Sequence, residues 1–533
     1  MLASIDSPWI RVAFTVAALA ALESPVALVG QSSGGNDPWF GLPLPPALTP
    51  HAPTVLIGDR GPVPARVPAG EEGFRELEGS AISRDLETII GFSRESRADR
   101  EIGSGQLWGR VAGFPSSRRT VEWTADQFRA AGIQHVEVQR FAQDDAASMW
   151  LPLSWEVRLL GDDAFGRGSA DVVLESAMPL SPSQLVGGQL TAPVVFVGAG
   201  HPAELTGVDV RGRIAVQQVI PQAHMVFERS PTVPRAQELM RRGAVAVINV
   251  MKQPGNERAR DFSNCGGPCF NLGGRDGHFL LNVLEEATAA GTLDRLRLHL
   301  ELETGVAEGM TAENGVAVIP GSRSEETIIL NAHADAWFDG AGDNGDGLAV
   351  LIALARHFAQ PANRPERTLV FVASAGHHTP GINGPRSFLT MNPDLAGRAV
   401  VAVNIEHVAQ RNLTPARSES ADGYRETVAD VGEAPIVAGV TNDSPLIENL
   451  FVRGVERYGT NFVSERSSMA SGESGGYRQL EANVVTLMQA PPLYHTSGEV
   501  FEVISIPGLE RMARFLAFFV KQLDQAPRER LGL

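Results

Sequence analysis

The chain has 533 residues, of which 43% are hydrophobic and 20% are charged, and its formal net charge is −17. This composition is typical of a soluble globular protein, and the length indicates about two to four domains. The excess of negative charge argues against a nucleic-acid partner, because phosphate binding requires a basic surface.

An apolar run over residues 12–22 follows Arg11 near the N-terminus. The run is too short to cross a bilayer as a helix, but it suits the core of a secretory signal. Asp6 and the lack of a clean cleavage site favour the alternative, a buried N-terminal helix. We expect a signal segment in residues 1–30, export to the periplasm or the extracellular space, and no stable membrane span.

The next residues predict a tether and then the start of an α/β domain. Residues 31–79 are rich in proline and glycine, which is typical of an extended linker. Apolar residues recur at helical spacing over residues 81–92 and 119–131, and a strand is expected at residues 136–138. This order predicts that residues 80–154 form the first part of an α/β domain.

Residues 155–302 differ in character and predict a small β-rich insert. The segments 208–216 and 242–249 resemble the protease-associated domain, a module often inserted into secreted peptidases; an unrelated α/β insert is the alternative. Cys265 and Cys269 suit a local disulfide in an exported protein and would be free thiols in a cytosolic one. Short β-rich runs occur at residues 194–197, 214–219 and 245–250.

Strands alternate with helices over residues 303–533, which predicts the main part of the α/β domain. Such alternation is typical of a mostly parallel sheet sandwiched between helices, here with the β-rich domain inserted into it. Strands are expected at residues 316–319, 327–331, 368–373, 400–405 and 484–487, and helices at residues 348–358 and 509–523.

Histidines and carboxylates follow four of these predicted strands. In open α/β sheets, catalytic groups lie beyond the carboxyl ends of the strands. Imidazole and carboxylate groups bind first-row metal ions, so these residues predict a metal centre. They are His333, Asp335 and Asp343 after one strand, His377 and His378 after the next, Glu406 and His407 after the third, and Tyr494 and His495 after the last.

The pattern resembles the family of zinc aminopeptidases and glutamate carboxypeptidases, including carboxypeptidase Q-like members with an inserted protease-associated domain. The resemblance implies two divalent metal ions, with zinc the expected metal, that activate a bridging water to hydrolyse a peptide or small amide substrate. It also implies that Asp343 bridges the two ions and that Asp335 orients His333. The implied ligands are His333, Asp343, His378, Glu406 and His495.

Two positions depart from the family pattern. His377 and His378 stand where the family has a Glu-Glu pair, and Glu406 stands where an aspartate is usual. His378 keeps a metal-binding group. His377 keeps a proton acceptor that can serve as the general base, with a reference pKa of about 6.5 instead of about 4.3. His407 is expected to support a neighbouring ligand or to pack in the core.

The substituted pair leaves other functions open. The chain could be a catalytically silent binding module, or a single-metal relative similar to the glutaminyl cyclases. Glu473, Tyr477 and Tyr494 are expected to contact substrate, Glu473 through a substrate ammonium, although a solvated loop carboxylate is an equal alternative for Glu473. A homodimer also stays open.

Overall fold

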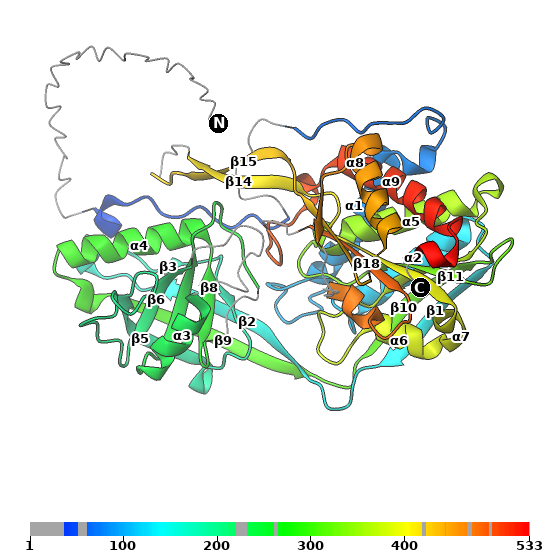
Figure 1. Cartoon of the computed structure of the whole chain (residues 1–533). Helices are drawn as coiled ribbons and strands as arrows, with labels where there is room; N and C mark the ends of the chain where they lie inside the picture. Colours follow the sequence, from blue (N-terminus) through cyan, green and yellow to red (C-terminus); the bar gives the residue numbers. More distant parts are fainter. Residues whose placement is uncertain are drawn as a thin grey trace, which may run out of the picture.

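The computed structural model describes residues 37–51, 61–219, 232–260, 265–417, 423–442, 444–465, 472–489 and 493–531. These residues form two lobes, each built around an eight-stranded sheet, and a separate β-hairpin (Figure 1). No helix within these ranges is long and apolar enough to cross a membrane. The predicted signal segment in residues 1–30 lies outside the described residues.

The main lobe contains a sheet whose centre is parallel. Its strand order is β1-β10-β12-β11-β13-β18-β16-β17. Neighbouring strands from β12 to β18 run parallel, whereas β1, β10 and β16 each have an antiparallel neighbour. The strands are β1 (His135–Ala142), β10 (Thr311–Ile319), β12 (Thr368–Ser374), β11 (Thr327–His333), β13 (Ala399–Glu406), β18 (Asn483–Gln489), β16 (Ile436–Val440) and β17 (Phe462–Glu465).

Helices cover both faces of this sheet. Successive side chains of a strand point to opposite faces, so Ile328 and Leu330 of β11 pack in one apolar core and Ile329 packs in another. The predicted α/β class, with a mostly parallel sheet between helices, is confirmed. The first core is covered by α1 (Gly79–Ala98), α2 (Pro115–Ala130), α5 (Asp346–Ala359), α8 (Pro445–Tyr458) and α9 (Ile506–Asp524), and the second by α6 (Gly384–Met391), α7 (Pro393–Gly397) and η8 (Gly472–Tyr477).

The second lobe is joined to the main lobe by β2 (Met149–Leu159) and β9 (Arg297–Ala307), a long antiparallel pair (Figure 1). Its strand order is β3-β2-β9-β5-β6-β7-β8-β4. Cys265 and Cys269 form a disulfide in this lobe. The remaining elements are β3 (Val172–Val173), β4 (Met178–Pro179), β5 (Gln189–Phe196), β6 (Ile214–Val219), α3 (Thr232–Arg241), β7 (Ala246–Met251), β8 (Cys269–Leu272) and α4 (Gly274–Ala289).

The described residues of the expected tether pack on both lobes. Trp39 is buried, with its ring stacked on Phe165 and edge-on to Phe279. His51 Nδ1 lies 2.8 Å from Asp339 Oδ1 in the main lobe. Aromatic burial and the contact of His51 therefore hold residues 37–51 of the expected extended tether against the two lobes.

The hairpin formed by β14 (Arg411–Arg417) and β15 (Glu426–Glu433) was not predicted. It extends from the main lobe toward the second lobe (Figure 1). Near its tip, the Tyr424 hydroxyl donates a hydrogen bond of 3.1 Å to the carbonyl oxygen of Gln253 in the second lobe. The hairpin is thus a second contact between the lobes.

Candidate metal centre

The predicted ligands meet at one edge of the main sheet. The strands β12, β11, β13 and β18 are adjacent and parallel, so their carboxyl ends lie side by side. The ligands are His333 at the end of β11, His378 after β12, Glu406 at the end of β13, His495 after β18, and Asp343 in the turn η6 (Ala341–Gly345) before α5.

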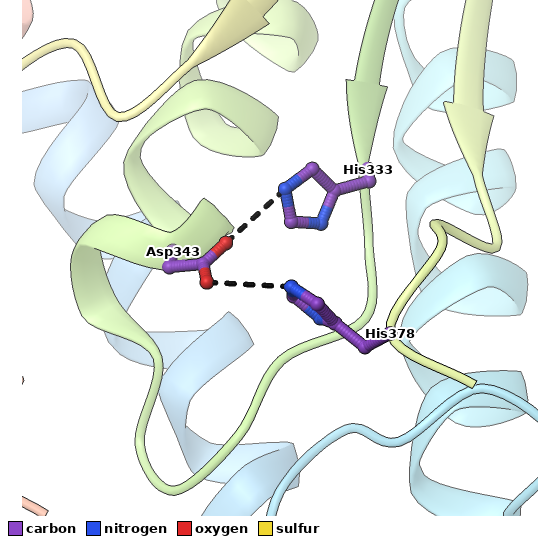
Figure 2. Close-up of side chains that lie close together, drawn as sticks. All are labelled: His333, Asp343 and His378. Atoms are coloured by element: carbon purple, nitrogen blue, oxygen red, sulfur yellow. Dashed lines mark ion pairs between the residues drawn. The ribbon is translucent and has the colours of Figure 1, made fainter. Parts of the chain in front are cut away.

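The buried carboxylate of Asp343 lies at the centre of this cluster. Its Oδ1 faces His333 Nε2 at 3.2 Å and His407 Nε2 at 2.9 Å. Its Oδ2 faces His378 Nε2 at 3.4 Å and His495 Nε2 at 2.8 Å. Figure 2 shows the two oxygens turned toward different imidazoles. Asp343 therefore divides the cluster into two sets of donor atoms.

The inner set consists of His333, Glu406, His407 and Asp343 Oδ1. Glu406 Oε1 lies 3.7 Å from His333 Nε2 and 3.9 Å from His407 Nε2. Asn404 donates a hydrogen bond of 2.7 Å to the other oxygen of Glu406, which orients this carboxylate. All of these side chains are buried.

The outer set consists of His378, His495 and Asp343 Oδ2. The Nε2 atoms of the two histidines lie 3.2 Å apart. Both histidines line a cavity of about 320 Å³. Side chains of both lobes line this open cavity, among them Arg260 of the second lobe, whose guanidinium lies 3.4 Å from the centre of the Trp337 ring.

Asp335 faces one imidazole of each set. Its Oδ1 accepts a hydrogen bond of 2.9 Å from His333 Nδ1. Its Oδ2 lies 3.2 Å from His378 Nδ1 and accepts the backbone N–H of His378 at 3.3 Å. Gly376 makes room for this carboxylate, because a Cβ there would lie 1.6 Å from Asp335 Oδ1. With Nδ1 directed at Asp335, each ring presents Nε2 to the centre.

A buried arginine fixes the loop between His333 and Asp343. Arg110 donates hydrogen bonds to the carbonyl oxygens of Ala334 at 3.1 Å, Asp339 at 2.8 Å and Gly340 at 3.0 Å. Burial lowers the pKa of Arg110 to about 10, so it stays charged at neutral pH. This cation also lies beneath the cluster of carboxylates and lowers the cost of burying them.

The donor atoms fit divalent first-row metal ions. Four buried atoms that make no hydrogen bond among the described residues point into the cluster: His333 Nε2, His407 Nε2 and both carboxylate oxygens of Asp343. An unsatisfied buried polar atom costs about 1–3 kcal/mol, and cations bound between these atoms would satisfy all of them. With bonds of about 2.0–2.1 Å to zinc, ligand atoms at tetrahedral angles lie about 3.3 Å apart. The observed separations, 2.8 to 3.9 Å, bracket this value.

The carboxylates of the centre raise the pKa values of two of its imidazoles. Burial lowers the pKa of His333, but the hydrogen bond to Asp335 and the carboxylates of Asp343 and Glu406 raise it well above 6.5. Burial also lowers the pKa of His407, and the Asp343 carboxylate raises it above its usual value. Burial raises the pKa of Glu406, but His333 and His407 lower it to about 2. Protons and metal ions therefore compete for the same nitrogen atoms.

His377 lies beside the outer set and is paired with Glu473. A hydrogen bond joins His377 Nδ1 to Glu473 Oε1, and the Glu473 side chain is fully buried. Burial lowers the pKa of His377, but the Glu473 carboxylate raises it to about 9. The alternative of a solvated loop carboxylate is therefore wrong for Glu473, and its contact with a substrate ammonium stays a prediction.

Of the two tyrosines expected to contact substrate, one lines the cavity. The ring of Tyr494 lies in the cavity wall and stacks on His495 at a centroid distance of 3.7 Å. Tyr477 is fully buried, and its hydroxyl donates a hydrogen bond of 3.0 Å to Asn331 Oδ1. The expected substrate contact of Tyr477 is therefore wrong; this side chain belongs to the core beneath the site.

His407 is the residue of the cluster whose contribution sequence reasoning missed. His407 was expected to support a neighbouring ligand or to pack in the core, and in a regular strand the side chain after Glu406 would point to the opposite face of the sheet. The strand ends at Glu406, and His407 has a φ of 51°. This left-handed backbone turns the imidazole to the same side as the Glu406 carboxylate. Only the unusual succession of Glu and His at a strand end could have drawn attention to it.

Comparison with known proteins identifies the class to which this site belongs. The sequence model of peptidase family M28 matches residues 314–520, which contain every residue of both donor sets. A glutamate carboxypeptidase 2 homolog of Caenorhabditis briggsae is 34% identical over 117 residues, which are 21% of this chain and 14% of that protein. An inactive zinc metalloprotease of Schizosaccharomyces pombe is 24% identical over 143 residues, 26% of this chain and 18% of that protein.

Solved structures show the same fold. The peptidase M28 precursor of Shewanella amazonensis SB2B superimposes with a TM-score of 0.56 at 17% identity, covering 84% of this chain and 98% of that one. BSAP, a zinc aminopeptidase from Bacillus subtilis, gives a TM-score of 0.53 at 16% identity, covering 85% and 98%. The fold is thus an α/β fold shared with a zinc aminopeptidase, and the segment that carries the site matches a peptidase family. The resemblance to the zinc aminopeptidases and glutamate carboxypeptidases is confirmed. The matched segments span less than a fifth of the two sequence relatives named above.

We expect metal affinity to fall steeply as the pH drops below 7. The raised pKa values of His333 and His407 favour protonated imidazoles in metal-free protein, and each must lose its proton to bind an ion. Displacement of these protons predicts a loss of affinity of up to about 100-fold per pH unit. Zinc titrations against a competing chelator at pH 6.0, 6.5 and 7.0 measure this slope, and proton release on zinc addition checks it. An affinity that is flat across this range contradicts the assignment.

Proposed function

We propose that the chain is an exopeptidase-like hydrolase of peptide or small amide bonds that uses two divalent ions, with zinc the expected metal. The observation that carries this proposal is the Asp343 carboxylate, whose two oxygens face two separate sets of imidazoles. Ions held by these sets would supply Lewis-acid polarisation of a carbonyl group and a water of lowered pKa. The open cavity next to the outer set, of about 320 Å³, suits the end of a peptide or a small amide.

His377 is the residue that would move protons. Its Nδ1 is bound by Glu473, so Nε2 is the nitrogen that the ring can present to the cavity. Positive charge in the neighbouring outer set would lower the pKa of His377 from about 9 toward neutrality. Nε2 would then accept a proton from the attacking water and donate it to the leaving amine. Glu473 would hold the ring in the required tautomer.

Changing Asp343 to Asn tests the proposed centre. Asparagine keeps the shape but removes the charge and one of the two metal-binding oxygens, so both ions should be lost. Hydrolysis of aminoacyl amides and short peptides should fall by about 10³-fold or more. Elemental analysis counts the ions in the parent and the variant. Asp209→Asn, at an exposed site far from the centre, is the matched control.

The ion count also separates the alternatives. Two ions per parent chain support the proposal, one supports a single-metal relative, and none supports a silent binding module. A D343N protein that keeps both ions would remove Asp343 from the centre.

Replacing His377 with alanine should lower kcat by about 10²–10³-fold, because proton transfer in the transition state is lost. Metal content should stay at the parent value, since His377 belongs to neither donor set. His135→Ala, which removes an exposed histidine at the start of β1, should change neither quantity. An H377A enzyme with parent kcat would show that another group moves the proton.

Export of the chain is part of the proposal. The apolar run at residues 12–22 motivates it, and a disulfide between Cys265 and Cys269 is compatible with an oxidising compartment. Mass spectrometry of protein from its native host should show a shortened N-terminus and cysteines that resist alkylation until reduced. An intact N-terminus with alkylatable thiols would contradict export.

A further inference from the structure

The position of His407 carries a further inference about how the two ions differ. The residue has a φ of 51°, in the left-handed region that residues with a Cβ rarely adopt. Such a conformation is unfavourable and persists where the surroundings impose it. Its effect is to bury the imidazole against Asp343, with Nε2 2.9 Å from Asp343 Oδ1.

The hydrogen bond made by His407 Nδ1 fixes the tautomer of the neutral ring, and so determines whether Nε2 carries a hydrogen or a lone pair. His407 Nδ1 lies 3.2 Å from the carbonyl oxygen of Gln489. A carbonyl oxygen only accepts, so Nδ1 carries the hydrogen, and Nε2 of the neutral ring has a lone pair. That nitrogen is buried and makes no hydrogen bond among the described residues. This nitrogen and Asp343 Oδ1 can share either a proton or a metal ion, and a metal ion bound to both atoms would take the place of the proton.

We infer that His407 is a fourth protein ligand of the inner ion, so that the inner position is closed and the outer position is open. This inference rests on the proposed two-ion centre. The inner ion would be held by His333, Glu406, His407 and Asp343 Oδ1, and the outer ion by His378, His495 and Asp343 Oδ2. Zinc sites with four protein ligands are structural, whereas sites with three keep a position for water or substrate.

The burial of the two sets supports this division of roles. His378 and His495 of the outer set line the cavity, whereas His333, Glu406 and His407 of the inner set do not. The inner ion would therefore have a structural role and hold Asp343 and the strand ends in place. The outer ion would bind the substrate. The outer ion should also exchange faster, because it has fewer ligands and lies on the cavity.

Substitution of His407 by glycine tests the inference in the full chain. Glycine tolerates a positive φ, so the variant removes the imidazole without straining the backbone. In parent protein, chelator titration should release the two ions in separate steps, with the outer ion leaving first. In H407G, inner-ion affinity should fall at least 100-fold, and outer-ion affinity should change by less than threefold. One equivalent of Co²⁺ should give a visible absorption spectrum that H407G alters and H495A does not.

Chemical rescue separates the imidazole from any effect on folding. Added imidazole should restore tight binding of the inner ion to H407G by occupying the vacated space, and it should not affect H495A at the inner position. An H407G protein that retains both ions with parent affinities would overturn the inference and leave the proposed function standing. A parent protein that takes up no ion would overturn both.

Discussion

The structure of the centre follows from the cost of burying negative charge. Asp335, Asp343 and Glu406 lie together at one edge of the sheet with almost no exposure to solvent. Uncompensated carboxylates in such a place are very unfavourable. Arg110 supplies one fixed positive charge beneath them, and the imidazoles supply the rest as protonated rings or as ligands of metal ions. The number of histidines around Asp343 is therefore a consequence of the number of buried carboxylates.

The same reasoning applies to the proposal that His377 and His378 stand in place of a Glu-Glu pair. Imidazoles in place of two carboxylates would remove negative charge next to the proposed ions. Asp335 compensates at His378, and Glu473 compensates at His377, each by contact with Nδ1. The carboxylates of Asp335 and Glu473 thus lie behind the two imidazoles and do not themselves supply the donor atoms. Their contacts with Nδ1 also fix the orientation of both rings.

The second lobe and the N-terminal segment influence the site from outside the main sheet. Arg260 and Trp337, one from each lobe, form part of the cavity wall beside the outer set. His51 contacts Asp339, in the loop whose carbonyl oxygens are held by Arg110. Access to the centre and the position of its loop therefore depend on packing between lobes.

The sequence by itself determined the main strands and the set of residues at their ends. Buried parallel strands are continuous apolar runs, and the polar residues that follow them must lie at one edge of the sheet. The orientation of single side chains was decided only by the tertiary structure. The imidazole of His407 joins the inner set because one residue adopts a left-handed backbone. Glu473 pairs with a histidine 96 residues away in the chain. Local periodicity carries no information on either contact, because each depends on how loops pack after the strands have assembled.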